Sequence, residues 1–201
     1  MTTVRPGPAR AAARLASRWA TCRRGVATIE FGMLAPMILI LFFGMVEASD
    51  IFSVKRRVAN AANALVDLVG QSEQITPDEL TDIFTGVKKM IENEDLEAVT
   101  MEIYSVVRDD EETDSIIVQW SRDDHMTSVL APGSAFSELQ DASVLKQRLS
   151  VLVVDIEYEY ASMLSTRIYG SPVTIAERAV RIPRRVSRVQ FCPTDEPDEC
   201  L

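Results

Sequence analysis

The segment from Arg23 to Phe31 combines residues that could support cleavage of the chain and pairing of the new terminus. It reads RRGVATIEF and directly precedes a long apolar run. Cleavage after Gly25 would create an α-amino group on Val26, four residues before the carboxylate of Glu30. A carboxylate in lipid needs such a partner, from its own chain or from a neighbouring subunit. The alternative is that Glu30 is an interfacial residue whose side chain extends toward the lipid headgroups.

Little else in the sequence has the residue types of a catalytic or metal site. There is no glycine-rich phosphate loop, no GxSxG and no HExxH pattern. The single histidine, His125, is expected in an exposed loop, where histidine commonly has no chemical role. An expected strand carries three acids at alternate positions, Asp155, Glu157 and Glu159, which indicates a solvated face. Side chains spaced in this way along a strand do not form the compact cage of oxygens that calcium needs. We expect no enzyme activity, no cofactor and no metal.

The three cysteines fall into different expected compartments. Cys22 precedes the apolar run and should be a free cytoplasmic thiol. Cys192 and Cys200 enclose CPTDEPDEC close to the C-terminus, an acidic loop with two prolines. In an oxidising periplasm a disulfide between them is the natural expectation, and two unpaired thiols are the disfavoured alternative.

Residues 25–49 are predicted to form a transmembrane helix. No charge appears between Glu30 and Glu47, and the 24 residues from Val26 to Ser49 would span roughly 36 Å as a helix. Residues 1–24 contain six arginines and no acidic residue, so the positive-inside rule places the N-terminus in the cytoplasm. The remainder carries 15 basic and 30 acidic residues, a balance that disfavours nucleic-acid binding.

Two other interpretations of the apolar run stay open. It could be the hydrophobic part of a removed secretory signal, with Val46-Glu47-Ala48 as a loose cleavage site, although its length exceeds the usual signal. It could also be a buried helix of a soluble protein, which the arginine-rich flank disfavours. Pro36 should kink the span, yet transmembrane helices tolerate proline without any attached function.

The remaining pattern predicts an α+β fold, in which a long N-terminal helix packs on a small antiparallel sheet of about four strands. The parts are a disordered basic leader 1–24, the transmembrane helix 25–49, a periplasmic domain 50–191 that begins with the continued helix 50–70, and an acidic loop 192–201. The continued helix has an apolar stripe that packs on the sheet or, alternatively, forms a coiled coil between subunits. Its members are Ile51, Val54, Val58, Ala61, Leu65 and Leu68.

A second helix should begin at Thr76, whose capping box with Glu79 and following proline are typical of a helix start, and run to about Glu92. Three strands follow from period-two alternation, and a fourth should cover about 171–182. The apolar sides of the three are Val99, Met101 and Ile103; then Ile116, Val118 and Trp120; then Leu152, Val154, Ile156, Tyr158 and Tyr160. The acidic stretch 109–114 should be a hairpin connection, and 137–149 a short helix.

At its N-terminal segment the sequence resembles a known family. Arg23-Arg24-Gly25, then Glu30-Phe31 and an apolar helix, looks like a class III, pilin-type signal. The wider EFGMLAPMILILFFGMVEASDIF, with Pro36 and Glu47, resembles the TadE/TadG-like proteins of the bacterial tight-adherence pilus system. Two later segments resemble strand segments of proteobacterial members: VQWSRD (118–123) and DIEYEYASML (155–164). The C-terminal PRR followed by a late Cys resembles the C-terminus of those members.

This resemblance implies a non-catalytic, pilin-like or pseudopilin role in the assembly of a tight-adherence (Flp-type) pilus. It implies cleavage between Gly25 and Val26 by a prepilin peptidase, helix assembly through Glu30, Phe31 and Pro36, and anchoring in the bacterial inner membrane with a periplasmic C-terminus. Its partners would be other pilin-like subunits and the assembly machinery. The rival function is a membrane-tethered periplasmic sensor or binding domain unrelated to pili, and an anchored hydrolase ranks below both.

Overall fold

The computed structural model describes residues 24–91, 98–108, 115–137, 139, 150–162, 166, 170–193 and 200. The chain divides into two compact units, Met1–Ala48 and Ser49–Leu201. One helix, α2 (Arg24–Val69), contributes to both units. The leader 1–23, the hairpin connection 109–114 and nearly all of the expected helix 137–149 lie outside the described residues.

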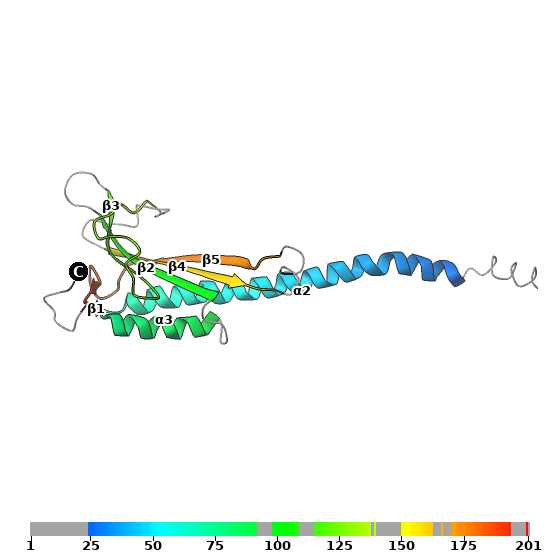
Figure 1. The fold of residues 1–201 in the computed structure, drawn as a ribbon, viewed down its shortest axis with the longest axis horizontal. Helices are drawn as coiled ribbons and strands as arrows, with labels where there is room; N and C mark the ends of the chain where they lie inside the picture. The colour runs from blue at the N-terminus through cyan, green and yellow to red at the C-terminus, as the bar shows by residue number, and fades with distance from the viewer. Residues whose placement is uncertain are drawn as a thin grey trace, which may run out of the picture. The chain divides into compact units, whose positions relative to one another are not determined.

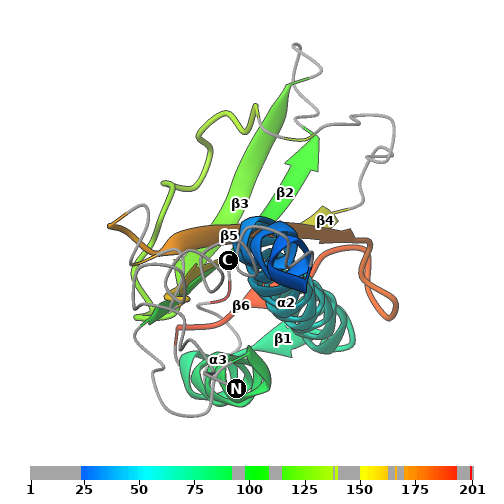
Figure 2. The same cartoon turned by 90° about the vertical axis from the view of Figure 1, so that its right-hand side faces the viewer.

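The second unit is α+β, as the sequence predicted. Its main sheet is antiparallel with four strands in the order β3-β2-β4-β5. The strands are β2 (Val99–Arg108), β3 (Ile116–Asp123), β4 (Ser150–Tyr160) and β5 (Val173–Arg181). The C-terminal part of α2 and helix α3 (Pro77–Ile91) lie side by side on one face of this sheet (Figures 1 and 2).

The capping box predicted for α3 is present. The Thr76 backbone N–H donates to Glu79 Oε2 at 3.1 Å, and the Glu79 N–H donates to the Thr76 hydroxyl at 3.4 Å. These two bonds satisfy donors that the first turn of a helix leaves without partners. Four apolar side chains of α3 then enter the core at helical spacing: Leu80, Phe84, Val87 and Ile91.

The apolar stripe of α2 packs on the chain's own sheet, so that alternative for the stripe is confirmed. Val54, Val58, Ala61 and Leu65 are buried in the same cluster as the inward-facing residues of β2 and β4. Leu68, however, is 45% exposed, and Val69 is buried in its place. A straight α-helix repeats every 3.6 residues, so a stripe written with a period of 3.5 drifts off the buried face along its length.

Strand β3 contains a bulge that the alternation did not reveal. Ser105 of β2 lies opposite Trp120, and the next residue, Val106, lies opposite Val118, which leaves Gln119 as the extra residue. Trp120 therefore belongs to the core under the helices, whereas Val118 belongs to a second cluster on the other face. The prediction that Val118 and Trp120 share one face was wrong, because a bulge shifts the alternation by one residue.

Part of the sheet's second face is also covered. Tyr104, expected on the polar side of β2, is buried and packs on Phe136, with ring centroids 5.4 Å apart. Val151 and Val153 of β4 are buried in the same small cluster. A segment after β3 supplies this cover, and its backbone is tied to the strand where the Phe136 N–H donates to the Ile116 carbonyl at 2.8 Å.

A small parallel sheet near the C-terminus had no counterpart in the sequence analysis. It pairs β1 (Gln74–Ile75) with β6 (Gln190–Phe191). Phe191 is buried against Trp120, at 5.7 Å between ring centroids, and carries the Arg122 guanidinium 4.1 Å above its own ring. Burial lowers the pKa of Arg122 below its usual value, and the charge of Asp123 partly opposes this shift.

Candidate membrane and processing segment

The residues predicted to be cleaved and to assemble all lie on the N-terminal part of α2. Gly25 and Val26 form its first turn, Glu30 and Phe31 lie one turn later, and Pro36 is inside the helix. All five of these residues are exposed within the chain. A methyl group built on Gly25 would meet no atom within 4 Å, so the glycine is not required by packing in this chain.

Apolar side chains cover this part of α2 on every side. Its best 18-residue window has a mean hydropathy of 2.2, and none of that window is buried. A core helix of a soluble protein would hide a stripe of this surface. The helix is therefore long and apolar enough to cross a membrane and fits a membrane anchor. The exposed side chains include Ile29, Met33, Leu34, Met37, Ile38, Leu39, Ile40, Leu41, Phe42 and Phe43.

Glu30 is the acidic residue among these apolar neighbours. Its side chain is exposed and makes no ion pair or hydrogen bond with the described part of the chain. Val26 precedes it by four residues, which places the two positions about 6 Å apart along the helix axis. After cleavage, Val26 would be the first residue of the helix. The N-terminal end of a helix carries a partial positive charge, which favours a nearby carboxylate such as that of Glu30.

The helix is unbroken across Pro36. Proline has no backbone N–H, so the carbonyl of Gly32 lacks its usual partner at this point. Further along, Glu47 closes the apolar run, and one of its carboxylate oxygens is shielded from solvent without a hydrogen bond in the described chain.

The chain matches the family model of the TadE-like proteins over residues 25–66. This segment is TadE-like. The family that the sequence resembled is therefore confirmed over the apolar part of α2 and most of its continuation. The match ends within α2, so β1 to β6 and α3 lie outside it. No curated protein and no solved structure matches the chain.

The remaining predicted site residues lie in the second unit. Cys192 and Cys200 are placed at disulfide distance, with their sulfur atoms 2.00 Å apart. The Cys192 N–H donates to the Ile75 carbonyl at 3.0 Å, which continues the β1–β6 pairing to the start of the acidic loop. Residues 194–199 of that loop are outside the described part.

His125 lies in a loop after β3, as expected, with its side chain 82% exposed. The side chain of its neighbour Asp124 is only 5% exposed and pairs with Lys88 of α3, so that carboxylate has a structural partner. Within the described ranges, no group of three or more His, Cys, Asp or Glu side chains could hold a metal ion.

Two features of this unit were not predicted from the sequence. Trp120 was expected on the apolar side of its strand and is fully buried, but the bond from its indole N–H to the Val189 carbonyl, at 2.8 Å, was not foreseen. The second feature is a row of charged side chains, Glu102, Asp155 and Arg178, which the strand registers set side by side. The alternation of β4 indicated its solvated acids, but strand pairing was needed to find their neighbours.

Proposed function

We propose that this chain is a non-catalytic, membrane-anchored, pilin-like subunit that takes part in the assembly of a tight-adherence (Flp-type) pilus. The observation that carries the proposal is the TadE-like match over 25–66, on a helix that is apolar on every side and bears Gly25 and Glu30 at its start. TadE-like proteins are a pilus-associated, structural family, which favours this function over a tethered sensor or hydrolase.

In this proposal a prepilin peptidase cleaves between Gly25 and Val26. The cleaved bond would lie at the start of α2, where the side chains are exposed, so the peptidase would not need to open packed structure. The new amine of Val26 would pair with Glu30 of its own chain or of a neighbouring subunit. Such pairing offsets the cost of a carboxylate in lipid and aligns two adjacent helices.

Phe31 and Pro36 would serve the same assembly step. Phe31 is 68% exposed within the chain, so its ring is available to a neighbouring helix. Pro36 leaves a carbonyl without its helical partner and would supply a flexible point when the subunit leaves the bilayer. The chain would be held in the inner membrane, with its N-terminus in the cytoplasm and its α+β unit in the periplasm.

Two substitutions test the proposal at different steps. Gly25→Val should leave a full-length, unprocessed chain in the membrane, because the peptidase needs the small residue before the cleaved bond. Glu30→Ala should insert as well as the native chain or better, because a membrane cost is removed, yet surface pili should fall. Processing is measured by the size of the chain, and pili by fibre counts or adherence.

Gly32→Val is the matched control for the glycine variant, since a methyl group on Gly32 likewise meets no atom within 4 Å. It should be processed normally. Normal pili in cells whose only copy carries both Gly25→Val and Glu30→Ala would refute the pilin-like role and leave the segment as an anchor alone.

A further inference from the structure

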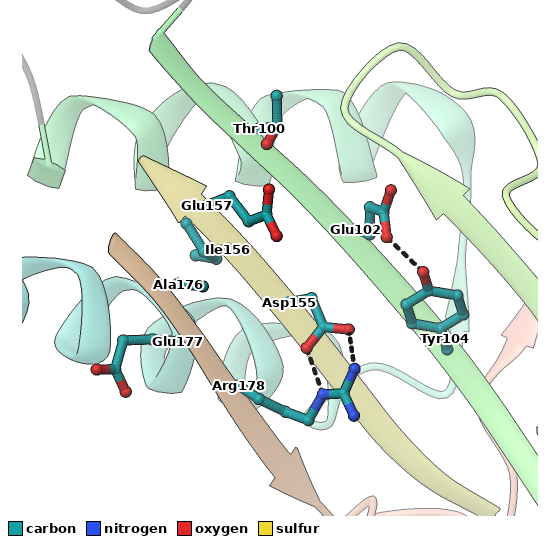
Figure 3. A pocket seen from close by; sticks show the side chains of 9 residues that line it. All are labelled: Thr100, Glu102, Tyr104, Asp155, Ile156, Glu157, Ala176, Glu177 and Arg178. Carbon is teal, nitrogen blue, oxygen red and sulfur yellow. Dashed lines mark hydrogen bonds and ion pairs between the residues drawn. The ribbon is translucent and has the colours of Figure 1, made fainter. Parts of the chain in front are cut away.

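One part of the sheet's second face has no covering element in the described structure. It is formed by β2, β4 and β5 on the side opposite the helices, and its side chains surround a shallow hollow of about 480 Å³ (Figure 3). Thr100, Glu157 and Ala176 are exposed there. We call this surface, made by Thr100, Glu102, Asp155, Glu157, Glu159, Ala176 and Arg178, the open face.

The open face is acidic because the registers bring carboxylates of two strands together. Glu102 lies directly opposite Asp155, and Asp155 lies opposite Arg178. The Arg178 guanidinium is already engaged, with Nε and Nη2 at 2.5 and 2.7 Å from the two oxygens of Asp155. In the next row Glu157 lies between Thr100 and Ala176, so neither cross-strand neighbour balances its charge.

Like charges placed together on neighbouring strands destabilise a sheet. Among the described residues, Glu157 and Glu159 make no ion pair, and Glu102 is bonded to the neutral hydroxyl of Tyr104 (Figure 3). A cationic surface docked on this face would remove the repulsion.

The same unit carries a complementary surface. The last residue of β5 and the segment after it contain four arginines, which we call the arginine segment: Arg181, Arg184, Arg185 and Arg188. Arg185 is exposed and has no partner among the described residues. Arg184 pairs with Asp67 of α2 at 2.7 Å but keeps 67% of its side chain exposed. The described contacts therefore leave much of this positive charge available.

One chain cannot bring its own arginine segment onto its own open face. Arg181 pairs with Leu152, which is three residues beyond the row of Asp155 and five beyond the row of the unbalanced Glu157, or about 10 and 16 Å along the strand. The segment is also fixed on the helix side, where the Arg184 N–H donates to the Gly70 carbonyl at 3.0 Å. The two surfaces can therefore meet only between molecules.

We propose that the open face docks the arginine segment of a second copy of this chain. The two surfaces differ, so the contact is head-to-tail. A contact of this kind leaves one free surface at each end and can be repeated from copy to copy. Complementary charge would set the order and orientation of the copies more than their affinity. The inference concerns the second unit and does not depend on cleavage after Gly25.

The test uses two differently tagged full-length copies in the same membrane. One copy carries Thr100→Cys on the open face, and the other carries Ser187→Cys in the arginine segment; both positions are exposed. Oxidation should link the two copies into a mixed dimer. The matched control replaces Thr100→Cys by Asp82→Cys, an exposed position on α3, and should give several-fold less mixed dimer.

Charge variants then test the cause of the contact. Glu157→Arg in the Thr100→Cys copy should lower the yield by about three- to tenfold, and Arg185→Glu in the other copy should restore it. Asp82→Arg makes the same charge change on α3 and should leave the yield unaltered. Raised salt should weaken the linking, because the charges are exposed.

Three results would overturn the proposal. They are a mixed dimer no more abundant than the Asp82→Cys control, an effect of Glu157→Arg that Arg185→Glu does not reverse, and linkage of Thr100→Cys mainly to itself or to a different protein. Gly25→Val should block processing without reducing the linking. Loss of the linking in a chain that still begins at Val26 would therefore refute the docking and leave the proposed function standing.

Discussion

Single carboxylates decide most of what the N-terminal segment can do. Glu30 has no partner in its own described chain and is surrounded by exposed apolar side chains. A charged side chain at the centre of a bilayer costs about 2.5–3.5 kcal/mol on insertion scales and less near an interface. A free amine on Val26, created by cleavage, would supply the opposite charge at helical spacing. In the proposed function, cleavage and assembly would thus be linked through one residue pair.

At the same scale, Cys192→Ser should give a folded and inserted chain. The disulfide would close a loop with a sequence separation of 8, for which chain entropy gives at most about 2–3 kcal/mol. The Cys192 N–H keeps its bond to the Ile75 carbonyl whatever the side chain is. Thermal unfolding and membrane fractionation check this outcome.

The pairing itself can be tested by counting thiols. Native protein purified without reductant should show no reactive thiol after unfolding, because the proposed cleavage after Gly25 removes Cys22 and the proposed disulfide joins the other two cysteines. The uncleaved Gly25→Val chain should show one, from Cys22. Two reactive thiols in the chain that begins at Val26, or three in the Gly25→Val chain, would show that Cys192 and Cys200 are not bonded in the cell.

The surroundings of helix α2 differ between its two halves. Its first half is exposed and apolar on every side, whereas its second half has one buried face and one polar face. The sequence predicted both halves, because a helical stripe and an uncharged run are local patterns. It misplaced the last member of the stripe, since a small error in period accumulates over several turns.

Leu65 and Leu68 form a matched pair of positions that tests which face of α2 is buried. Leu65 is fully buried, and Leu68 is 45% exposed. Leu65→Ala should therefore destabilise the second unit by about 2–5 kcal/mol, and Leu68→Ala by less than about 1 kcal/mol. Denaturant unfolding of the full chain in detergent, followed by tryptophan fluorescence, measures both. Equal losses would mean that the helix presents another face to the sheet.

The elements that the sequence did not predict depend on contacts between distant residues. A strand of two residues, such as β1 or β6, is too short to show alternation. The bulge at Gln119 is visible only once Ser105 and Trp120 are paired. The burial of Tyr104 depends on Phe136, which covers it from a later segment. For the described residues, the expected order of helices and long strands was correct because each has its own local period, whereas nearly all of the helix expected over 137–149 lies outside them.

The whole molecule separates its charges along the sequence. Six arginines and no acids precede residue 25, and the rest of the chain is strongly acidic. The described residues include one helix able to cross a membrane, and with it this asymmetry predicts a cytoplasmic N-terminus and a periplasmic second unit. The acidic balance disfavours nucleic acid and leaves basic protein surfaces as suitable partners.

This topology predicts the activity of a reporter that works only outside the cytoplasm. Fused after Leu201, it should be active, and fused before Met1 it should be silent. The opposite pattern, in cells where both fusions are stable, would refute the orientation. A silent reporter at both ends would contradict membrane crossing.

The first residue of the mature protein shows whether this chain is processed as a pilin-like subunit. The chain should be purified from the membrane of its host, and its N-terminus determined by sequencing together with the intact mass. The account predicts a mature chain that begins at Val26 and keeps the whole apolar part of α2, because a pilin-type peptidase removes the leader on the cytoplasmic side. A membrane-bound chain that still begins in the leader, or a chain that begins after Ala48 and has lost the helix, would contradict it.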